Sequence, residues 1–315
     1  MTDNHKPSVM FMGTPEFAAA QLAALYEGGY EIKAVVTQTD KPKGRGHRLA
    51  PPPVKEYALE KGLAVIQPAT LKSEEFAQFL RETDPEIIIV AAYGKLLPEN
   101  VISYPRFGCV NVHGSLLPKY RGAAPIQRAV MNGETLTGVT TMLMDKGLDT
   151  GDMLMKAEVP ILPCDDAGTL TSKMARAGAK LLLETIEKLV SGGITPEKQD
   201  SALSTYAAKI EKPDCAVDFK RPAADILNQI RALSPEPMAA STINGKPLKI
   251  ASAALSDLRS DAPAGTVAAV DGGITVSCGE GCVTIKELIP AGKNRMTAAA
   301  FVNGRQCSIG DKFGD

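Results

Sequence analysis

Short apolar runs recur along the first 150 residues, separated by stretches with helical spacing or turn residues. The clearest run, 87–92, is continuously apolar, which is typical of a strand buried on both faces of a parallel sheet. Further strands are predicted at 8–12, 31–37, 64–66, 109–112 and 138–144. Strands that alternate with helices predict a Rossmann-like, mostly parallel α/β sheet with helices on both faces.

Helices are expected between these strands, and two of them carry start signals. Ser73 begins a helical pattern that runs to Thr83, as an N-cap residue does. Thr14 is the expected N-cap of a helix that follows the first strand, with Pro15 at the first helical position. A third helix is predicted at 54–61, after a long polar stretch at 38–53 that is expected to be a loop.

The pattern changes near residue 190. A long amphipathic helix at 169–190 is followed by a polar stretch rich in Gly and Ser. Beyond it, a helix at 223–233 precedes short β-rich runs with turn signals at 244–245, 271–273 and 279–281. We therefore predict a catalytic domain at 1–190, a linker at 191–208 and a small, OB-like C-terminal β-barrel at 209–315.

Composition narrows the class of protein. The length of 315 residues suits two domains, and the hydrophobic content of 44% is enough for packed cores. The formal net charge is −1, so a nucleic-acid partner would need a local basic patch. No apolar run is long enough to span a bilayer and the first residues lack a signal-peptide pattern, so we expect a cytoplasmic protein without a membrane partner. The six cysteines form no C-x-x-C pair and there are only three histidines, so no metal site is predicted.

Three polar residues lie at the ends of predicted strands. Asn111 and His113 end one strand, and Asp149 follows the strand at 138–144. Ligands of an open α/β sheet sit outside the carboxyl ends of its strands, so these side chains are predicted to meet there. These three side chains suit the attack of an amine on a formyl carbon. An amide N–H or an imidazolium can stabilise the negative charge that develops on the formyl oxygen. A neutral imidazole can accept the proton that the amine loses. A carboxylate would fix the tautomer of the imidazole. A structural histidine and a turn-forming aspartate would give the same spacing.

A longer pattern surrounds these residues. The segments 111–129 and 144–154 closely resemble the signature segments of the 10-formyltetrahydrofolate-dependent formyltransferases. The segments 11–18, 37–55 and 289–293 resemble the same family, so the resemblance covers nearly the whole chain. One departure is Glu236, which stands where the family usually has an aromatic residue.

The resemblance implies a site as well as a reaction. It implies that Asn111, His113 and Asp149 are catalytic, that 10-formyltetrahydrofolate is the co-substrate, and that the protein is a monomer without a metal. The residues that it implies for the folate site come from three segments: Ser115, Leu116, Leu117 and Pro118; Tyr93, Gly94, Leu96 and Leu97; and Asp145, Gly147 and Leu148.

The acceptor that the resemblance implies is the α-amine of methionine on charged initiator tRNA, the substrate for translation initiation. The C-terminal domain is then expected to bind tRNA through Lys293 and Arg295, with Lys286 and Arg305 as further candidates. The stretch 38–53 carries one acid, Asp40, against four basic residues, Lys41, Lys43, Arg45 and Arg48. A one-signed loop of this length suits phosphate binding, although a solvated charged loop has the same composition.

Three other functions fit parts of the pattern. A formyltransferase for a small amine, such as glycinamide ribonucleotide or an amino-sugar nucleotide, would share the trio but not be expected to carry both the basic loop and the second domain. A nucleotide-binding oxidoreductase is disfavoured because the G-x-G-x-x-G fingerprint is absent. A non-catalytic RNA-binding module would leave the trio without a use.

Overall fold

The computed structural model describes residues 6–43 and 48–314, and the chain divides into two compact units. The first unit comprises 1–125, 136–160 and 171–207, and the second comprises 126–135, 161–170 and 208–315. In the part of the chain that the structure describes, no helix is long and apolar enough to cross a membrane.

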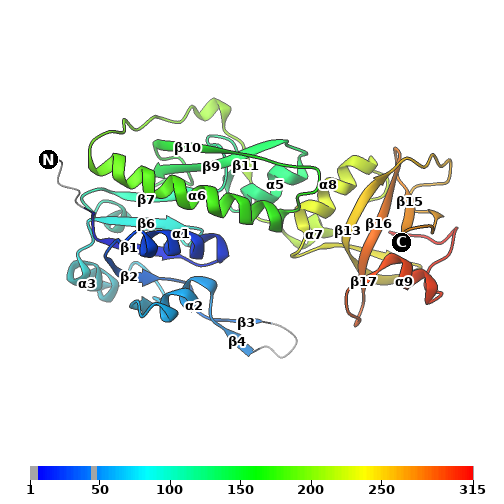
Figure 1. Ribbon diagram of the computed structural model, residues 1–315, viewed down its shortest axis with the longest axis horizontal. Coiled ribbons are helices and arrows are strands. Elements are labelled where there is room, and N and C mark those ends of the chain that lie inside the picture. The colour runs from blue at the N-terminus through cyan, green and yellow to red at the C-terminus, as the bar shows by residue number, and fades with distance from the viewer. Residues whose placement is uncertain (1–5, 44–47, 315) are drawn as a thin grey trace. The chain divides into compact units, whose positions relative to one another are not determined.

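A seven-stranded sheet forms the centre of the first unit, with the strand order β10-β9-β7-β6-β1-β2-β5 (Figure 1). Its strands are β1 (Val9–Gly13), β2 (Ile32–Val36), β5 (Val65–Ile66), β6 (Ile87–Ala91), β7 (Cys109–His113), β9 (Leu136–Leu143) and β10 (Met153–Pro160). The five strands from β7 to β5 are parallel, which confirms the predicted mostly parallel α/β sheet. β9 and β10 are antiparallel additions at one edge, and β10 was not predicted.

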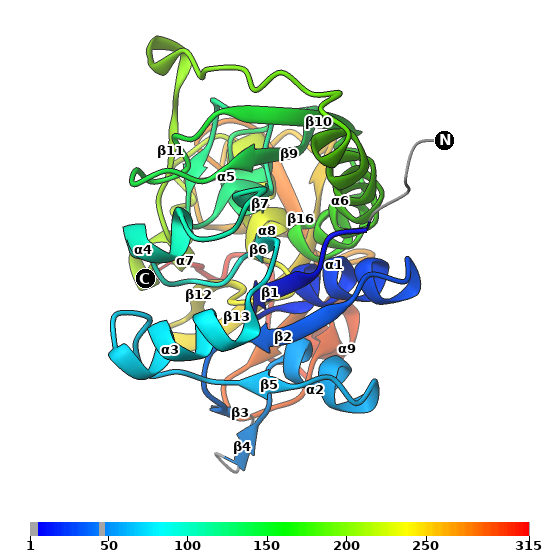
Figure 2. The same cartoon turned by 90° about the vertical axis from the view of Figure 1, so that its left-hand side faces the viewer.

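Helices cover both faces of this sheet. They are α1 (Glu16–Glu27), α2 (Pro53–Glu60), α3 (Glu74–Thr83), α4 (Glu99–Ile102) and α6 (Ala167–Val190). A further helix, α5 (Pro125–Met131), belongs almost entirely to the second unit. In the first unit, α1 and α6 lie on one face, and α3 and α4 on the other (Figure 2). The Gln21 side chain joins α1 to α6 by donating to the Ala175 carbonyl at 3.0 Å. On the other face, Phe76 and Leu80 of α3 pack in one buried cluster with Ile88.

The helix start signals had different outcomes. Ser73 is the N-cap of α3, and its hydroxyl accepts from the Phe76 N–H at 3.2 Å, as predicted. The prediction for Thr14 is wrong, because Pro15 is the N-cap of α1. The Thr14 hydroxyl instead donates to the Tyr93 carbonyl at 3.2 Å, which links the loops after β1 and β6.

The stretch 38–53, predicted to be a loop, contains a β-hairpin. Its strands are β3 (Lys41–Lys43) and β4 (Arg48–Ala50), which pair antiparallel. Alternating charged and apolar residues in so short a stretch give little strand signal, so the pairing with the returning chain decides its conformation.

The second unit contains a curled antiparallel sheet, which confirms the predicted small β domain (Figure 1, orange and red). Its elements are α7 (Lys212–Cys215), α8 (Ala223–Leu233), β12 (Ala239–Ile243), β13 (Lys246–Ser256), β14 (Val267–Ala269), β15 (Ile274–Ser277), β16 (Cys282–Pro290), β17 (Met296–Thr297) and α9 (Ala298–Asn303). The C-terminal segment completes the curl, since the Lys312 carbonyl accepts from Asn244 N–H after β12 and the Asp311 carbonyl accepts from Val267 N–H of β14, both at 2.9 Å.

Candidate active site

Strand β7 places the amide and the imidazole of the predicted trio. Side chains alternate across a strand, so Cys109, Asn111 and His113 point to the same face of the sheet. Cys109 donates its Sγ–H to the Val101 carbonyl of α4 at 3.5 Å, which identifies this face as the one covered by α3 and α4. Asn111 and His113 are only 8% and 6% exposed, so both are largely shielded from bulk water.

Asp149 reaches this pair by a route that the sequence did not predict. β9 runs antiparallel to β7 and pairs Leu143 with Val110, so the carboxyl end of β9 lies beside the start of β7. The expectation that two carboxyl strand ends meet is therefore wrong. Residues 144–152, here called the Asp149 loop, fold back along the face of β7 instead. They bring Asp149 Oδ1 to 3.7 Å from His113 Nδ1 and 3.5 Å from Asn111 Nδ2.

The surroundings of His113 fix which nitrogen bears its hydrogen. His113 Nε2 lies 2.9 Å from the Tyr120 carbonyl oxygen. A carbonyl can only accept, so Nε2 is the donor, and Nδ1 is the nitrogen that faces Asp149. The tautomer is thus set by the Tyr120 backbone, whereas the sequence suggested the carboxylate. The other oxygen of Asp149 accepts from the Gly122 N–H at 2.8 Å.

The turn after β7 contributes mostly buried side chains. Ser115 is fully buried and its hydroxyl donates to the Lys119 carbonyl at 2.6 Å, so this side chain shapes the turn from inside. Leu117 is buried in a small cluster with Met142 and Met153. Leu116 and Pro118 are partly exposed.

The two other predicted folate segments present apolar side chains. Leu96 is 76% exposed and Leu148 is 46% exposed, so both side chains present apolar surface. An ion pair of 2.8 Å joins Lys146 of the Asp149 loop to Glu99, the first residue of α4. This contact brings the segment with Leu148 to the start of α4, two residues after the segment 93–97 ends.

Other residues of these segments shape the backbone. Tyr93 is 2% exposed and Leu97 is buried, and burial raises the pKa of the Tyr93 phenol. Gly94 has a φ of 80°, which favours glycine. Asp145 Oδ1 accepts from Gly147 N–H at 3.0 Å and from the Thr150 hydroxyl at 2.7 Å, so this carboxylate closes a turn inside the Asp149 loop.

The predicted tRNA-contacting residues lie in two places. Lys41 is exposed on β3, Lys43 and Arg48 occupy paired positions of the β3–β4 hairpin, and Arg45 lies outside the described residues. The single acid, Asp40, is engaged by the Lys55 ammonium at 2.8 and 2.9 Å and by Gln67 at 2.8 Å. The hydrogen bond from Lys55 lowers the pKa of Asp40. The charge of Asp40 is thus paired with Lys55, which lies outside the hairpin.

The basic residues of the second unit are partly engaged. Lys293 and Arg295 are exposed between β16 and β17. Arg295 forms an ion pair with Glu287 and lowers the pKa of that carboxylate. Lys286 donates to the Gly272 carbonyl at 3.2 Å. Arg305 is exposed beyond α9.

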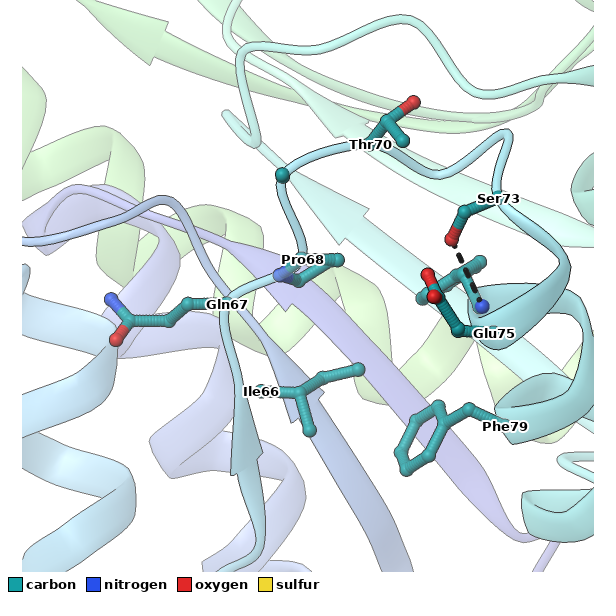
Figure 3. Close-up of a pocket in the computed structure, with 9 residues that line it drawn as sticks. Ile66, Gln67, Pro68, Thr70, Ser73, Glu75 and Phe79 are labelled. Atoms are coloured by element: carbon teal, nitrogen blue, oxygen red, sulfur yellow. Dashed lines mark hydrogen bonds between the residues drawn. The ribbon is translucent and has the colours of Figure 1, made fainter.

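A separate pocket lies beside β5 and the start of α3 (Figure 3). Its lining residues are Ile66, Gln67, Pro68, Ala69, Thr70, Ser73, Glu75, Phe76 and Phe79. Its lining contains none of the trio, and β5 is at the edge of the sheet opposite β9 and β10. Among residues 6–43 and 48–314, no group of His, Cys, Asp or Glu side chains is arranged to hold a metal ion.

Residues 6–186 match the family described as formyl transferase, and residues 209–306 match the formyl transferase C-terminal domain. The chain belongs to the formyl transferase family. Curated members of this family match it nearly end to end. The methionyl-tRNA formyltransferase of Caldanaerobacter subterraneus subsp. tengcongensis is 48% identical over 303 residues, which is 96% of this chain and 98% of that one. The methionyl-tRNA formyltransferase of Bacillus licheniformis is 43% identical over 308 residues, covering 97% and 98%.

Solved structures of distantly similar proteins share the fold. HypX from Aquifex aeolicus in complex with tetrahydrofolic acid aligns with a TM-score of 0.66 at 17% identity. The alignment covers 96% of this chain and 48% of HypX. An N-formyltransferase from Helicobacter canadensis, in complex with folinic acid and dTDP-3-aminofucose, aligns with a TM-score of 0.65 at 20% identity, covering 92% and 99%. These distant likenesses support the architecture of the formyl transferase chain.

The sequence patterns missed residues in the predicted linker that contact this site. Gln199 and Thr205 bond to the Asp149 loop and to Tyr120, respectively. A glutamine and a threonine in a polar stretch carry no periodic or spacing signal, so only the folded chain reveals them.

Proposed function

We propose that this chain transfers a formyl group from 10-formyltetrahydrofolate to the α-amino group of methionyl initiator tRNA. The observation that carries the proposal is the end-to-end match, at 43–48% identity, to proteins named methionyl-tRNA formyltransferase. The Asn111–His113–Asp149 cluster supports the reaction class, because it supplies polar groups for a carbonyl oxygen and a migrating proton.

The proposed chemistry assigns a role to each member of the trio. Asn111 donates an amide N–H to the formyl oxygen as the amine attacks and that oxygen gains negative charge. His113 uses Nδ1 to accept a proton from the attacking amine, because its Nε2–H is held by the Tyr120 carbonyl. Asp149 then stabilises the imidazolium across the 3.7 Å that separates Oδ1 from Nδ1. As the bond from the formyl carbon to N10 of the folate breaks, the proton passes to that nitrogen.

The folate is proposed to lie against the loops that surround the trio. The exposed side chains of Leu96 and Leu148 offer apolar surface for the flat pteridine ring. Ligand pockets are usually lined by apolar side chains of this kind. Backbone groups of the segments 93–97, 115–118 and 145–148 would orient its polar edge. Ser115 and Leu117 contribute by holding the turn, since their side chains are buried.

For tRNA, we propose two contact surfaces. The first is the basic stretch 38–53, with Lys41, Lys43, Arg45 and Arg48, and the second is the turn with Lys293 and Arg295. We propose that residues 1–190 carry out catalysis and also bear the first tRNA surface, and that the C-terminal domain at 209–315 bears the second. We further propose that the protein acts as a monomer in the cytoplasm.

The test measures transfer of labelled formyl from 10-formyltetrahydrofolate. Charged initiator methionyl-tRNA is compared with glycinamide ribonucleotide and with an amino-sugar nucleotide, using wild-type protein and His113→Ala. We expect transfer to tRNA alone, and only by the wild type. Transfer to a small amine at a higher kcat/KM than to tRNA would contradict the proposal.

A further inference from the structure

Residues 197–207, here called the strap, contact the Asp149 loop at one end and residues 120–122 at the other. At one end, Glu197 and Met153 exchange two backbone hydrogen bonds of 2.8 Å, directly after the Asp149 loop. The strap continues through the short helix η1 (Ser201–Leu203) to β11 (Tyr206–Ala207). β11 pairs with β8 (Arg121–Gly122), whose Gly122 N–H binds Asp149.

Gln199 links the two loops through its side chain. Its Nε2 donates to the Asp149 carbonyl at 2.9 Å and to the Gly151 carbonyl at 2.7 Å, and its Oε1 accepts from Arg121 Nε at 2.9 Å. Both amide hydrogens and the amide oxygen are thus committed to active-site loops. Its neighbours Lys198 and Asp200 are exposed, whereas Gln199 is half-buried, so this side chain alone turns inward from its part of the strap.

Thr205 reaches the imidazole indirectly. Its hydroxyl accepts from the Tyr120 N–H at 2.8 Å, and its carbonyl accepts from the Arg121 N–H at 2.9 Å. The Tyr120 carbonyl is the acceptor for His113 Nε2. The Tyr120 carbonyl shares its peptide group with the Arg121 N–H, which the Thr205 carbonyl binds, and the Thr205 hydroxyl holds the peptide group before it. Thr205 therefore fixes Tyr120 from both sides.

The position of Asp149 requires such support. The antiparallel direction of β9 delivers the Asp149 loop from the far end of β7, so the carboxylate depends on loop contacts rather than on a strand. Asp149 also has a φ of 52°, a left-handed conformation that is uncommon for non-glycine residues, although aspartate adopts it more readily than most. The bonds from Gln199 to the carbonyls of Asp149 and Gly151 hold the backbone in that conformation.

We propose that Gln199 and Thr205 are positioning residues for formyl transfer, Gln199 by holding Asp149 and Thr205 by holding the Tyr120 carbonyl that orients His113. The inference rests on the proposed function. Neither residue contacts the reacting atoms, so each acts through the His113–Asp149 pair. A displacement of about 1 Å in a catalytic constellation can cost on the order of 10²-fold in rate.

The test compares Gln199→Ala and Gln199→Glu with the matched control Ser201→Ala, which changes an exposed residue of the same strap. Glutamate keeps an acceptor for Arg121 but cannot donate to the two carbonyls. We expect both Gln199 variants to lose kcat by on the order of 10²-fold, with the KM for 10-formyltetrahydrofolate within about twofold and the Tm close to that of Ser201→Ala. A kcat for Gln199→Glu near that of the wild type would overturn the proposal, because Gln199 would then serve only Arg121.

Thr205 and a double variant separate positioning from general stability. Thr205→Ser keeps the hydroxyl and should retain most of kcat, whereas Thr205→Val should lose it. In an Asp149→Asn background, Gln199→Ala should cost much less than in the wild type, because both changes act on one group. Full additivity, or equal kcat for the serine and valine variants, would overturn the proposal. Failure of the wild type to formylate tRNA would instead contradict the proposed function.

Discussion

Gly122 donates its backbone N–H to Asp149 Oδ2 at 2.8 Å while lying against β11 on its other side. A Cβ at this position would come 2.7 Å from the Ala207 carbonyl oxygen and 2.8 Å from the Tyr206 ring, and the φ of 120° is one that favours glycine. Because Gly122 has no side chain, β11 of the strap can pair with the same stretch of backbone that binds the Asp149 carboxylate.

Gly122→Ala is therefore expected to move either β11 or the N–H that binds Asp149. We expect the free energy of unfolding to fall by roughly 1–3 kcal/mol. We also expect kcat to fall by more than the smaller fraction of folded protein would explain. Gly192→Ala is the matched control, because Gly192 also has a positive φ, of 72°, but no atom of the described residues lies within 4 Å of where its Cβ would stand. Normal turnover in Gly122→Ala would show that this contact does not hold Asp149.

His113→Ala should abolish most turnover while leaving the fold intact, because its ring fills a polar site at the end of β7 rather than the apolar core. Folate binding by fluorescence and the Tm provide the controls for folding. Retention of near-normal kcat would remove His113 from the proposed mechanism.

Asn111→Ala should lower kcat by on the order of 10²–10³, as does the loss of one donor to a developing oxyanion. The KM for folate should change less than kcat, because the hydrogen bond from Asn111 to the formyl oxygen strengthens in the transition state. Asp149→Asn should also lower activity strongly, since it removes the charge that faces His113 Nδ1. A change confined to KM would assign these residues to substrate binding alone.

The β3–β4 hairpin is expected to contribute to tRNA affinity through charge. Neutralising Lys41, Lys43 and Arg48 together should flatten the salt dependence of tRNA binding by up to about 0.9 units of slope per lost contact to a duplex phosphate. Asp40 does not offset these charges, because Lys55 engages it. The measurement is binding of charged initiator tRNA across a salt series, and an unchanged slope would identify the hairpin as a solvated surface.

Arg45→Ala should weaken kcat/KM for charged tRNA and leave folate affinity unchanged. Arg45→Lys should rescue only part of the loss, because lysine lacks the planar fork of arginine. Equal kinetics in wild type and Arg45→Ala would exclude a role for this residue in tRNA recognition.

Stability should depend on acid pH through Asp214. Arg128 of α5 binds both oxygens of this carboxylate at 3.1 and 2.9 Å, and this hydrogen bonding lowers the pKa of Asp214. A lowered carboxyl pKa stabilises the fold above the unfolded pKa of about 3.9, and this contribution is lost as the pH falls through the lower folded value.

Asp214→Asn should accordingly reduce the free energy of unfolding at pH 7 by on the order of 1–2 kcal/mol, since the pair is partly exposed. The difference from the wild type should shrink as the pH falls below about 4. Glu184→Gln, which removes a loose surface pair of 3.9 Å with Lys180, should change stability little at any pH. Asp214 also accepts from the Glu211 N–H at the start of α7 at 2.8 Å. A difference that is constant with pH would assign the effect of Asp214→Asn to this helix-capping contact instead of its charge.

Features that depend only on neighbouring residues could be predicted from the sequence alone. The apolar run of β6, the Ser73 cap of α3 and the Asn244–Gly245 turn between β12 and β13 depend on neighbouring residues and on backbone preferences. The signature segments around Asn111 and Asp149 likewise identified the family, because they are long and contiguous. The sequence thus determined the fold class, the family and the candidate trio.

Tertiary structure decided how these parts meet. β10 has a mostly exposed or half-buried edge pattern in which only the first three residues form an apolar run. The direction of β9 is set by its partners, so neither feature was evident from periodicity. The bonds from Gln199 to Asp149 and from Thr205 to Tyr120 join residues that are 50 and 85 positions apart. Such contacts depend on where the chain returns, and single polar residues in a turn-rich stretch leave no local trace of it. The catalytic candidates are visible in the sequence, whereas the strap that holds them exists only in the folded chain.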